Sequence, residues 1–193
     1  MKADLKICTP YNDGLKYKKP LKLVQALKMR QYAENKKRVC AKETSLEEFL
    51  EEVAKNKKLS GTKVSAYVGK GASAIVFETP EGKILKLTRG NHFPLNRPPQ
   101  DFDVPIYKKG KSGSVHYYLE EKMYGHGLGE GFVDIMRDMI RKAGFKPYDM
   151  YDSDYFQLGM SREGKLYLLD PECARYKTIF HAIWDKVKRF CKK

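Results

Sequence analysis

A glycine-containing turn between two short alternating segments is the feature that most constrains the fold of this chain. Residues 63–68 (KVSAYV) and 74–78 (AIVFE) flank this turn, and residues 83–87 (KILKL) follow after the tight turn TPEG. Apolar residues that alternate with polar ones, in short runs separated by glycine-rich turns, are typical of antiparallel strands joined by hairpins. The sequence therefore predicts a meander of three strands over residues 63–87.

The rest of the chain mixes helical and strand patterns. Residues 45–57 begin with Ser45 and Glu48 at capping-box spacing and carry an apolar stripe, which predicts a helix. Helical spacing also recurs over residues 21–37, 132–144 and 178–190, and hairpins are expected over residues 104–123 and 156–170. The sequence therefore predicts an α+β protein built around an antiparallel sheet.

Composition bounds the class of protein. Hydrophobic residues make up 41% of the chain and charged residues 32%, which is typical of a globular protein. No apolar run approaches the roughly 20 residues that span a bilayer, and the N-terminus lacks a secretory apolar stretch. We therefore expect a cytoplasmic protein without a membrane partner. The cysteines are widely spaced, which predicts free thiols rather than a zinc site or disulfides: Cys8, Cys40, Cys173 and Cys191.

The net charge of +14 lies in the two ends of the chain. Residues 1–42 carry a net charge of +9 and residues 175–193 one of +6, whereas the middle is close to neutral. Basic ends of this kind bind polyanions in some proteins and form a solvated basic surface in others. Both interpretations remain open at this point.

The glycine turn and a lysine on the next strand form the first chemical signal. Residues 69–76 read GKGASAIV, a GxGxxAxV pattern that lies between two strands rather than between a strand and a helix. Glycine lets phosphate oxygens approach backbone N–H groups closely. Lys86 follows ten residues after Val76, between Leu85 and Leu87. A lysine on such an apolar strand either faces solvent or meets an anion.

A second signal lies near the C-terminus. Asp170 ends the apolar strand LYLLD, and an acid in that position is a frequent magnesium ligand. Gln157 precedes it by thirteen residues, and Asp152 by eighteen. Together these residues reproduce the order of a catalytic aspartate, an amide ligand, a hairpin and a metal-binding aspartate.

With both signals, residues 60–175 resemble the protein-kinase-like superfamily. The resemblance implies a two-lobe fold, with an antiparallel sheet in the N-lobe and a much reduced helical C-lobe. It divides the chain into a basic N-terminal extension (1–44), an N-lobe (45–123) and a C-lobe (124–193). The LLDPECA segment is also similar to choline and aminoglycoside kinases, so the branch stays open.

The resemblance also implies a role for each matching residue. Lys86 would hold the ATP phosphates, Val76 would cover adenine, and Asp152 would take the proton of the attacking hydroxyl. Gln157 and Asp170 would hold magnesium. The nucleotide would contact Gly69, Lys70, Gly71, Ala72, Ser73, Ala74, Val76, Lys86, Glu120, Glu121 and Met123.

The chain also departs from the kinase pattern. Met150 and Tyr151 replace the histidine and arginine of the catalytic loop, and little sequence follows Asp170. Four prolines exclude the helix that normally carries the glutamate partner of the strand lysine. We expect the helix at residues 45–57 to supply that partner instead, from Glu47, Glu48, Glu51 or Glu52.

Three functions follow from these patterns. The first is an ATP- and magnesium-dependent kinase that phosphorylates hydroxyls of a protein or another large partner. The second is a pseudokinase that serves as a binding module. The third is a basic nucleic-acid-binding domain, for which the charged ends are the motive.

Overall fold

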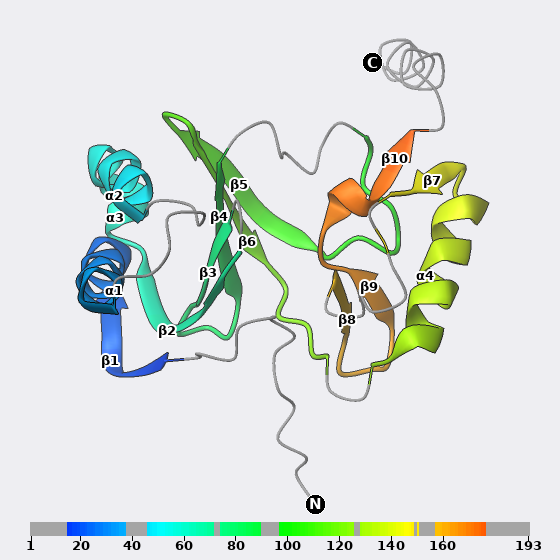
Figure 1. Ribbon diagram of the computed structural model, residues 1–193, viewed down its shortest axis with the longest axis horizontal. Coiled ribbons are helices and arrows are strands. Elements are labelled where there is room, and N and C mark those ends of the chain that lie inside the picture. The colour runs from blue at the N-terminus through cyan, green and yellow to red at the C-terminus, as the bar shows by residue number, and fades with distance from the viewer. Residues whose placement is uncertain are drawn as a thin grey trace, which may run out of the picture. The chain divides into compact units, whose positions relative to one another are not determined.

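The computed structural model describes residues 15–37, 46–71, 74–89, 97–125, 128–148, 150 and 157–176. These residues form two compact units. Figure 1 shows their helices and strands, coloured by residue number. The sheet unit contains the described residues of 15–89 and 105–122. The hairpin unit contains those of 97–104 and 123–176. Strands and helices occur in both, so the α+β class is confirmed.

A six-stranded antiparallel sheet organises the sheet unit. The strand order is β1-β2-β3-β4-β6-β5, so the three predicted strands of the meander lie in its middle. The strands are β1 (Leu15–Lys22), β2 (Lys63–Lys70), β3 (Ala74–Glu78), β4 (Ile84–Arg89), β5 (Ile106–Ser112) and β6 (Val115–Glu120).

Helices cover one face of this sheet. The helices α1 (Leu23–Lys37), α2 (Leu46–Lys55) and α3 (Lys57–Ser60) share a core with the strands. Leu46, Phe49 and Val53 of α2 are buried, as the apolar stripe predicts. From the sheet, the core takes Ile75 and Phe77 of β3 together with Leu85 and Leu87 of β4. The opposite face of β3 and β4 is therefore the one that carries Val76 and Lys86.

Residues 15–37 belong to the segment that the sequence assigns to a basic N-terminal extension with a helix over residues 21–37. In the structure this helix is α1, which buries Leu23, Ala26 and Leu27 in the core, and β1, a strand that the sequence pattern does not predict, pairs with β2. These few apolar positions lie on one side of the helix, whereas Lys28 is exposed. Residues 1–14 and 38–45 are outside the described part, including Ser45 of the predicted capping box.

The hairpin unit contains one long helix and two small sheets. Residues 130–142 form α4, and Gly144, with φ of +87°, follows its end in the left-handed conformation that glycine accommodates most readily. One sheet pairs β7 with β10, and the other pairs β8 with β9. The elements are α4 (Glu130–Lys142), β7 (Phe145–Pro147), β8 (Leu158–Met160), β9 (Leu166–Leu168), the 3-10 turn η2 (Pro171–Cys173) and β10 (Ala174–Tyr176).

The core of this unit lies between α4 and the strands. Val133, Met136 and Ile140 of α4 pack with Leu158 and Leu168 of the β8–β9 hairpin. The helix expected at residues 178–190 lies outside the described residues. No helix in the described part of the chain is long and apolar enough to cross a membrane.

Candidate functional site

The predicted phosphate-binding turn joins β2 to β3. Gly69 and Lys70 end β2, Ala74 begins β3, and the N–H of Gly71 donates to the carbonyl of Ala74 at 2.9 Å. A Cβ atom added at Gly71 would have no heavy atom within 4 Å. The backbone at Gly71 is thus uncovered on that side, which is the property that close approach of an anion requires. Ala72 and Ser73 lie outside the described residues.

The sheet aligns Gly69, Val76 and Lys86 in one row. Gly69 lies opposite Val76, Val76 opposite Lys86, and Lys86 opposite Tyr118 of β6. Directly opposed residues of antiparallel strands have their side chains on the same face. Val76 and Lys86 therefore share the face that α1 and α2 leave uncovered. This side of the sheet is called the Lys86 face below.

Thr88 is a residue of this face that the sequence motifs miss. It lies two positions beyond Lys86 on β4 and opposite Ala74, at the end of the glycine turn. Its side chain is 3% exposed, and its hydroxyl has no hydrogen-bond partner in the described part of the protein. A buried polar group without a partner destabilises the fold unless a ligand or water satisfies it. The only signal in the sequence is its strand position relative to Lys86.

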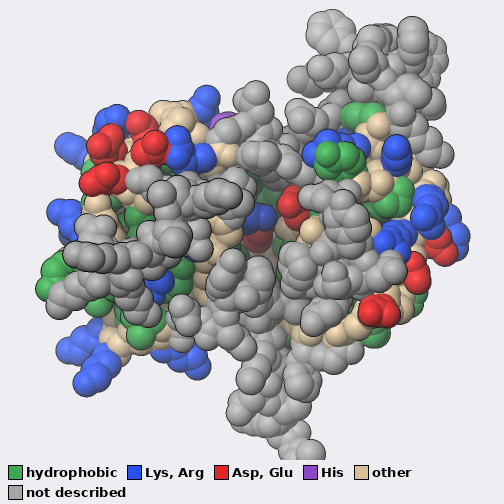
Figure 2. All heavy atoms as spheres, viewed as in Figure 1, with side chains coloured by type: hydrophobic (Ala, Val, Ile, Leu, Met, Phe, Trp, Pro, Cys, Tyr) green, Lys and Arg blue, Asp and Glu red, His purple; other side chains and the backbone are tan. Residues whose placement is uncertain are grey.

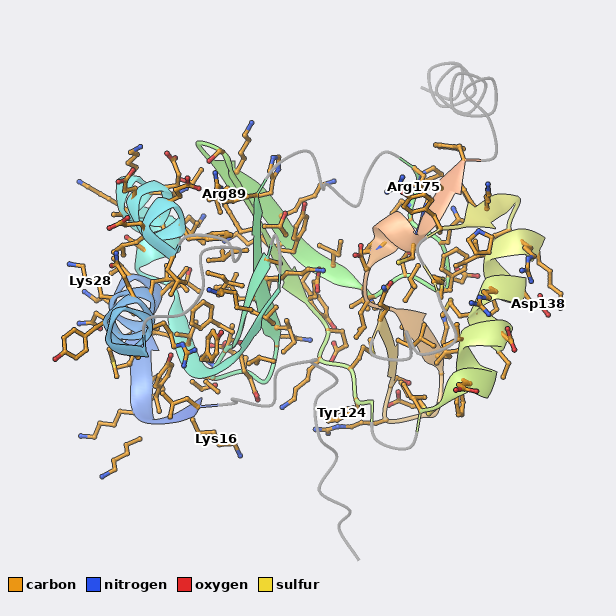
Figure 3. The ribbon with its side chains drawn as sticks, in the orientation of Figure 1. Lys16, Lys28, Arg89, Tyr124, Asp138 and Arg175 are labelled. Carbon is orange, nitrogen blue, oxygen red and sulfur yellow. The ribbon has the colours of Figure 1, made fainter. Side chains whose placement is uncertain are left out.

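The glutamates of α2 do not lie on the Lys86 face. Glu48 forms an ion pair with Arg89, which is on the helix-covered face because it alternates with Lys86 and Thr88 (Figure 3). Glu52 pairs with Lys55 of its own helix. The expectation that α2 presents a glutamate to Lys86 is therefore wrong, since α2 packs over Leu85 and Leu87 on the other side of the sheet.

The segment predicted to bind adenine is fixed to the sheet by ion pairs. Lys83 contacts the carboxylate of Glu121 at 2.8 Å, and Lys122 contacts that of Glu78 at 2.9 Å. The hydrogen bonds from Lys83 and from the Tyr107 hydroxyl lower the pKa of Glu121. The Glu121 side chain is thus committed to the protein, and its N–H already donates to Pro105.

The other two residues of this segment have different surroundings. Glu120 belongs to the Lys86 face, is 8% exposed and lies opposite Ile84, the neighbour of Lys86 two positions back on β4. Met123 belongs to the hairpin unit, where it is buried. A Cβ added at Gly159 would lie 2.5 Å from the Met123 Cβ atom, so this glycine permits the close approach of the segment to β8.

The predicted metal ligands lie together at one end of the β8–β9 hairpin. Leu158 pairs with Leu168, and beyond that pair the N–H of Leu169 donates to the Gln157 carbonyl at 2.8 Å. Asp170 is the next residue, so Gln157 and Asp170 leave the hairpin at the same end. Both side chains are partly exposed. The oxygen atoms at this end are of the kind that magnesium binds.

Cys173 adds a contact that the sequence does not reveal. Its thiol donates to Oε1 of Gln157, and its backbone N–H donates to the Asp170 carbonyl at 3.1 Å. The turn after Asp170 therefore orients the amide oxygen of Gln157. Among the described residues, no group of three or more His, Cys, Asp or Glu side chains could hold a metal ion. Asp152, the predicted catalytic base, lies outside those residues.

Arg97 supports this end of the hairpin unit. Its side chain is buried and forms two hydrogen bonds of 2.6 Å to the carboxylate of Asp103. It also donates to the carbonyls of Ala174 at 2.8 Å and Pro171 at 3.2 Å. Arg97 therefore fixes the turn that follows Asp170. Its partners lie up to 77 residues away in the chain, so no local sequence signal could identify it.

Comparisons with known proteins do not assign this chain to a family. No protein-family model matches it, and no curated protein matches it either. The candidate site therefore stands on the residues and their geometry.

Proposed function

We propose that this protein is a kinase-like phosphotransferase that uses ATP and magnesium to phosphorylate hydroxyls of a protein or another large partner. The observation that carries the proposal is the row of Gly69, Val76 and Lys86 across adjacent strands. It sets an open backbone turn, an apolar side chain and a cation on one face of the sheet. These three features are the ones that the phosphates and base of a nucleotide require.

The residues of the sheet unit fit a nucleotide in two further respects. The uncovered backbone at Gly71 leaves room for phosphate oxygens beside the turn. The hydroxyl of Thr88, buried on the same face and without a hydrogen-bond partner among the described residues, would gain one when a nucleotide binds. The ammonium of Lys86 would neutralise phosphate charge, and the Glu120–Met123 segment would border the adenine. Fixed donors of this kind stabilise the transferring group because they need no reorganisation.

The residues of the hairpin unit fit the magnesium and acceptor roles. Magnesium, when bound, would neutralise phosphate charge, and Gln157 and Asp170 would supply oxygen ligands to it. In the transfer, the acceptor oxygen bonds to the γ-phosphorus, and the bond from that phosphorus to the β–γ bridging oxygen breaks. ADP leaves with that oxygen, and Asp152 accepts the proton of the acceptor hydroxyl.

Transfer of labelled phosphate from ATP tests the proposal. The acceptor is the protein itself or a generic protein, with and without magnesium. Lys86→Met and Asp170→Asn are expected to reduce transfer by about 100-fold or more, the size found when one charge-stabilising group is removed. Lys108→Met, which removes an exposed lysine from β5, is the matched control and should leave transfer unchanged. Equal transfer in all four proteins would overturn the proposal.

A pseudokinase is the second candidate, and the contact of Cys173 with Gln157 favours it. The thiol hydrogen bond uses part of the accepting capacity of the amide oxygen that a metal would need. Nucleotide binding that raises the melting temperature, without transfer to any acceptor, would support this candidate over the enzyme.

A further inference from the structure

The outer edge of the sheet unit carries a surface of exposed lysines. Figure 2 shows Lys and Arg side chains at the lower left, where Figure 1 places β1, and Asp and Glu side chains near α2. The β1 lysine surface consists of side chains from β1, α3 and the start of β2. Its members are Lys16, Lys18, Lys19, Lys22, Lys57, Lys58 and Lys63.

These lysines have no acidic neighbours within their elements. β1, α3 and β2 contain no Asp or Glu, and neither do residues 23–33 of α1. All seven side chains are exposed, and none forms an ion pair with a described residue. Of the other described acids of this unit, four lie on α2, and four lie on β3, in the turn before β4 and at the end of β6: Glu47, Glu48, Glu51, Glu52, Glu78, Glu81, Glu120 and Glu121. The lysine-bearing elements β1, α3 and β2 are therefore free of acids, which lie on other elements of the unit.

The pairing of β1 with β2 places two of these charges together. Lys22 lies directly opposite Lys63. Like charges in directly opposed positions of a sheet destabilise it. The residues beside this pair are also linked, because the N–H of Leu23 donates to the carbonyl of Thr62 at 2.8 Å. Thr62 follows the end of α3 by two residues, so Lys57 and Lys58 belong to the same part of the chain. A bound polyanion would relieve the repulsion at this point.

Protection of the sheet edge does not account for the whole surface. Lysines and a proline on an edge strand prevent pairing with other chains, and β1 has both. However, β2 is an interior strand and α3 is a helix, so Lys57, Lys58 and Lys63 protect no edge. The positive charge of the surface therefore extends to residues that protection of the edge does not require.

We infer that the β1 lysine surface binds the phosphodiester backbone of a nucleic acid. From Lys16 to Lys22 the strand extends roughly 20 Å at the usual rise per residue. A line of cations of this length matches the linear charge of a polynucleotide better than the plane of a membrane. Contacts to phosphates carry no base information, so the surface binds without sequence preference. The surface does not include Lys86, and this activity does not depend on the proposed phosphotransfer.

Binding of labelled 20-nucleotide oligomers at several salt concentrations tests the inference. The arms are single-stranded DNA, single-stranded RNA of the same sequence and duplex DNA. The test variant is Lys18→Gln/Lys22→Gln/Lys63→Gln. We expect its affinity to fall by about tenfold or more, and its salt slope to fall by about 2, because each lost phosphate contact reduces the slope by roughly 0.7 to 0.9.

A second triple variant controls for net charge. Lys108→Gln/Lys111→Gln/Lys146→Gln removes three exposed lysines elsewhere and should change the affinity by less than about twofold. Circular dichroism and thermal melting establish that both variants fold. Equal weakening in both, or no oligomer binding by the wild type, would overturn the inference. Binding to vesicles of anionic lipid or to polyglutamate through these lysines, without oligomer binding, would overturn it as well.

Discussion

At the scale of single residues, strand alternation decides which chemistry is available on each side of the sheet. Lys86 and Thr88 lie on one face, whereas Leu85, Leu87 and Arg89 lie on the other. A shift of register by one residue would exchange these sets and remove the proposed site. The buried side chains of the core fix that register, so the core itself places the lysine.

Replacement of Thr88 by valine separates its two proposed effects. The exchange removes a buried hydroxyl that has no hydrogen-bond partner in the described part of the chain, and it keeps the shape of the side chain. We expect the free energy of unfolding of the ligand-free protein to rise by about 1 kcal/mol, since the unsatisfied group is lost. We also expect the affinity for ATP to fall by about five- to tenfold, and Thr88→Ser to retain it. Denaturant unfolding and calorimetric titration measure the two quantities.

The two possible failures of this prediction have different meanings. If the wild type does not bind ATP, the proposed function fails. If the wild type and Thr88→Val bind ATP equally, the proposed function stands and the role given to Thr88 fails.

The ion pair of Glu121 makes stability depend on acidic pH. Hydrogen bonds from Lys83 and Tyr107 lower the pKa of Glu121 from its ordinary value of 4.5. The unfolded chain therefore binds a proton more readily than the folded one, and the stabilisation by this carboxylate is lost as the pH falls below about 4.5. We expect Glu121→Gln to be less stable than the wild type at pH 6, and this difference to diminish by pH 3.

Denaturant unfolding at the two pH values measures this difference. Glu81→Gln is the matched control, because Glu81 is exposed in the turn before β4 and forms no ion pair with a described residue. A constant difference between Glu121→Gln and the wild type from pH 6 to pH 3 would contradict the prediction.

At the scale of elements, Arg97 connects segments that are distant in sequence. Its guanidinium binds the carboxylate of Asp103 and also donates to the carbonyls of Pro171 in η2 and Ala174 in β10. The hairpin itself adds a hydrogen bond of 2.7 Å from the N–H of Leu168 to the Phe102 carbonyl. The position of Asp170 thus depends on a segment that precedes it by about 70 residues, and not on the hairpin alone.

Loss of Arg97 should destabilise the hairpin unit strongly. Arg97→Met leaves Asp103 buried with an uncompensated charge, which typically costs about 3 to 5 kcal/mol. Thermal and denaturant unfolding measure the loss. Arg141→Met is the control, because the exposed pair of Arg141 with Asp138 within α4 contributes at most about 1 kcal/mol. Similar effects from the two substitutions would show that the Arg97 contacts do not support the unit.

At the scale of the whole molecule, the proposed function requires both units to respond to the same nucleotide. We expect magnesium and ATP together to slow amide hydrogen exchange in residues 84–89 of the sheet unit and in residues 157–170 of the hairpin unit. The physical reason is that binding suppresses local opening of the segments that contact the ligand. Mass spectrometry of peptides from the two regions measures the effect.

Asp170→Asn provides the comparison for that experiment. It should keep the slowing in residues 84–89 and lose most of it in residues 157–170, since the metal ligand is removed. Slowing confined to residues 84–89 in the wild type would contradict the role given to the hairpin unit, although nucleotide binding by the sheet would stand.

The local elements were predictable because their signals are local. The strand at residues 74–78 is confirmed with its predicted bounds, and α2 buries the side chains of its apolar stripe. The predicted hairpin at residues 104–123 is confirmed as well, with β5 beginning at Ile106. In each case, period and turn residues specify the element without reference to the rest of the chain.

The partners of these elements were less predictable. The lysines of residues 15–22 hide the alternating pattern of an edge strand in the sequence. This strand pairs with β2, which lies roughly 40 to 50 residues later in the chain. The face of the sheet on which α2 packs also decides the partner of Glu48. That partner is Arg89 rather than Lys86.

The sequence by itself determined the strands of the meander, the alternation that sets Val76 and Lys86 on one face, and the hairpin that carries Gln157 and Asp170. These depend on periodicity and on short turns, which a chain specifies over a few residues. Only the tertiary structure decided which face the helices cover, that Thr88 is buried without a hydrogen-bond partner among the described residues, and that Arg97 supports the end of the β8–β9 hairpin. These depend on contacts between residues far apart in the chain, which packing of the cores selects and no local pattern encodes.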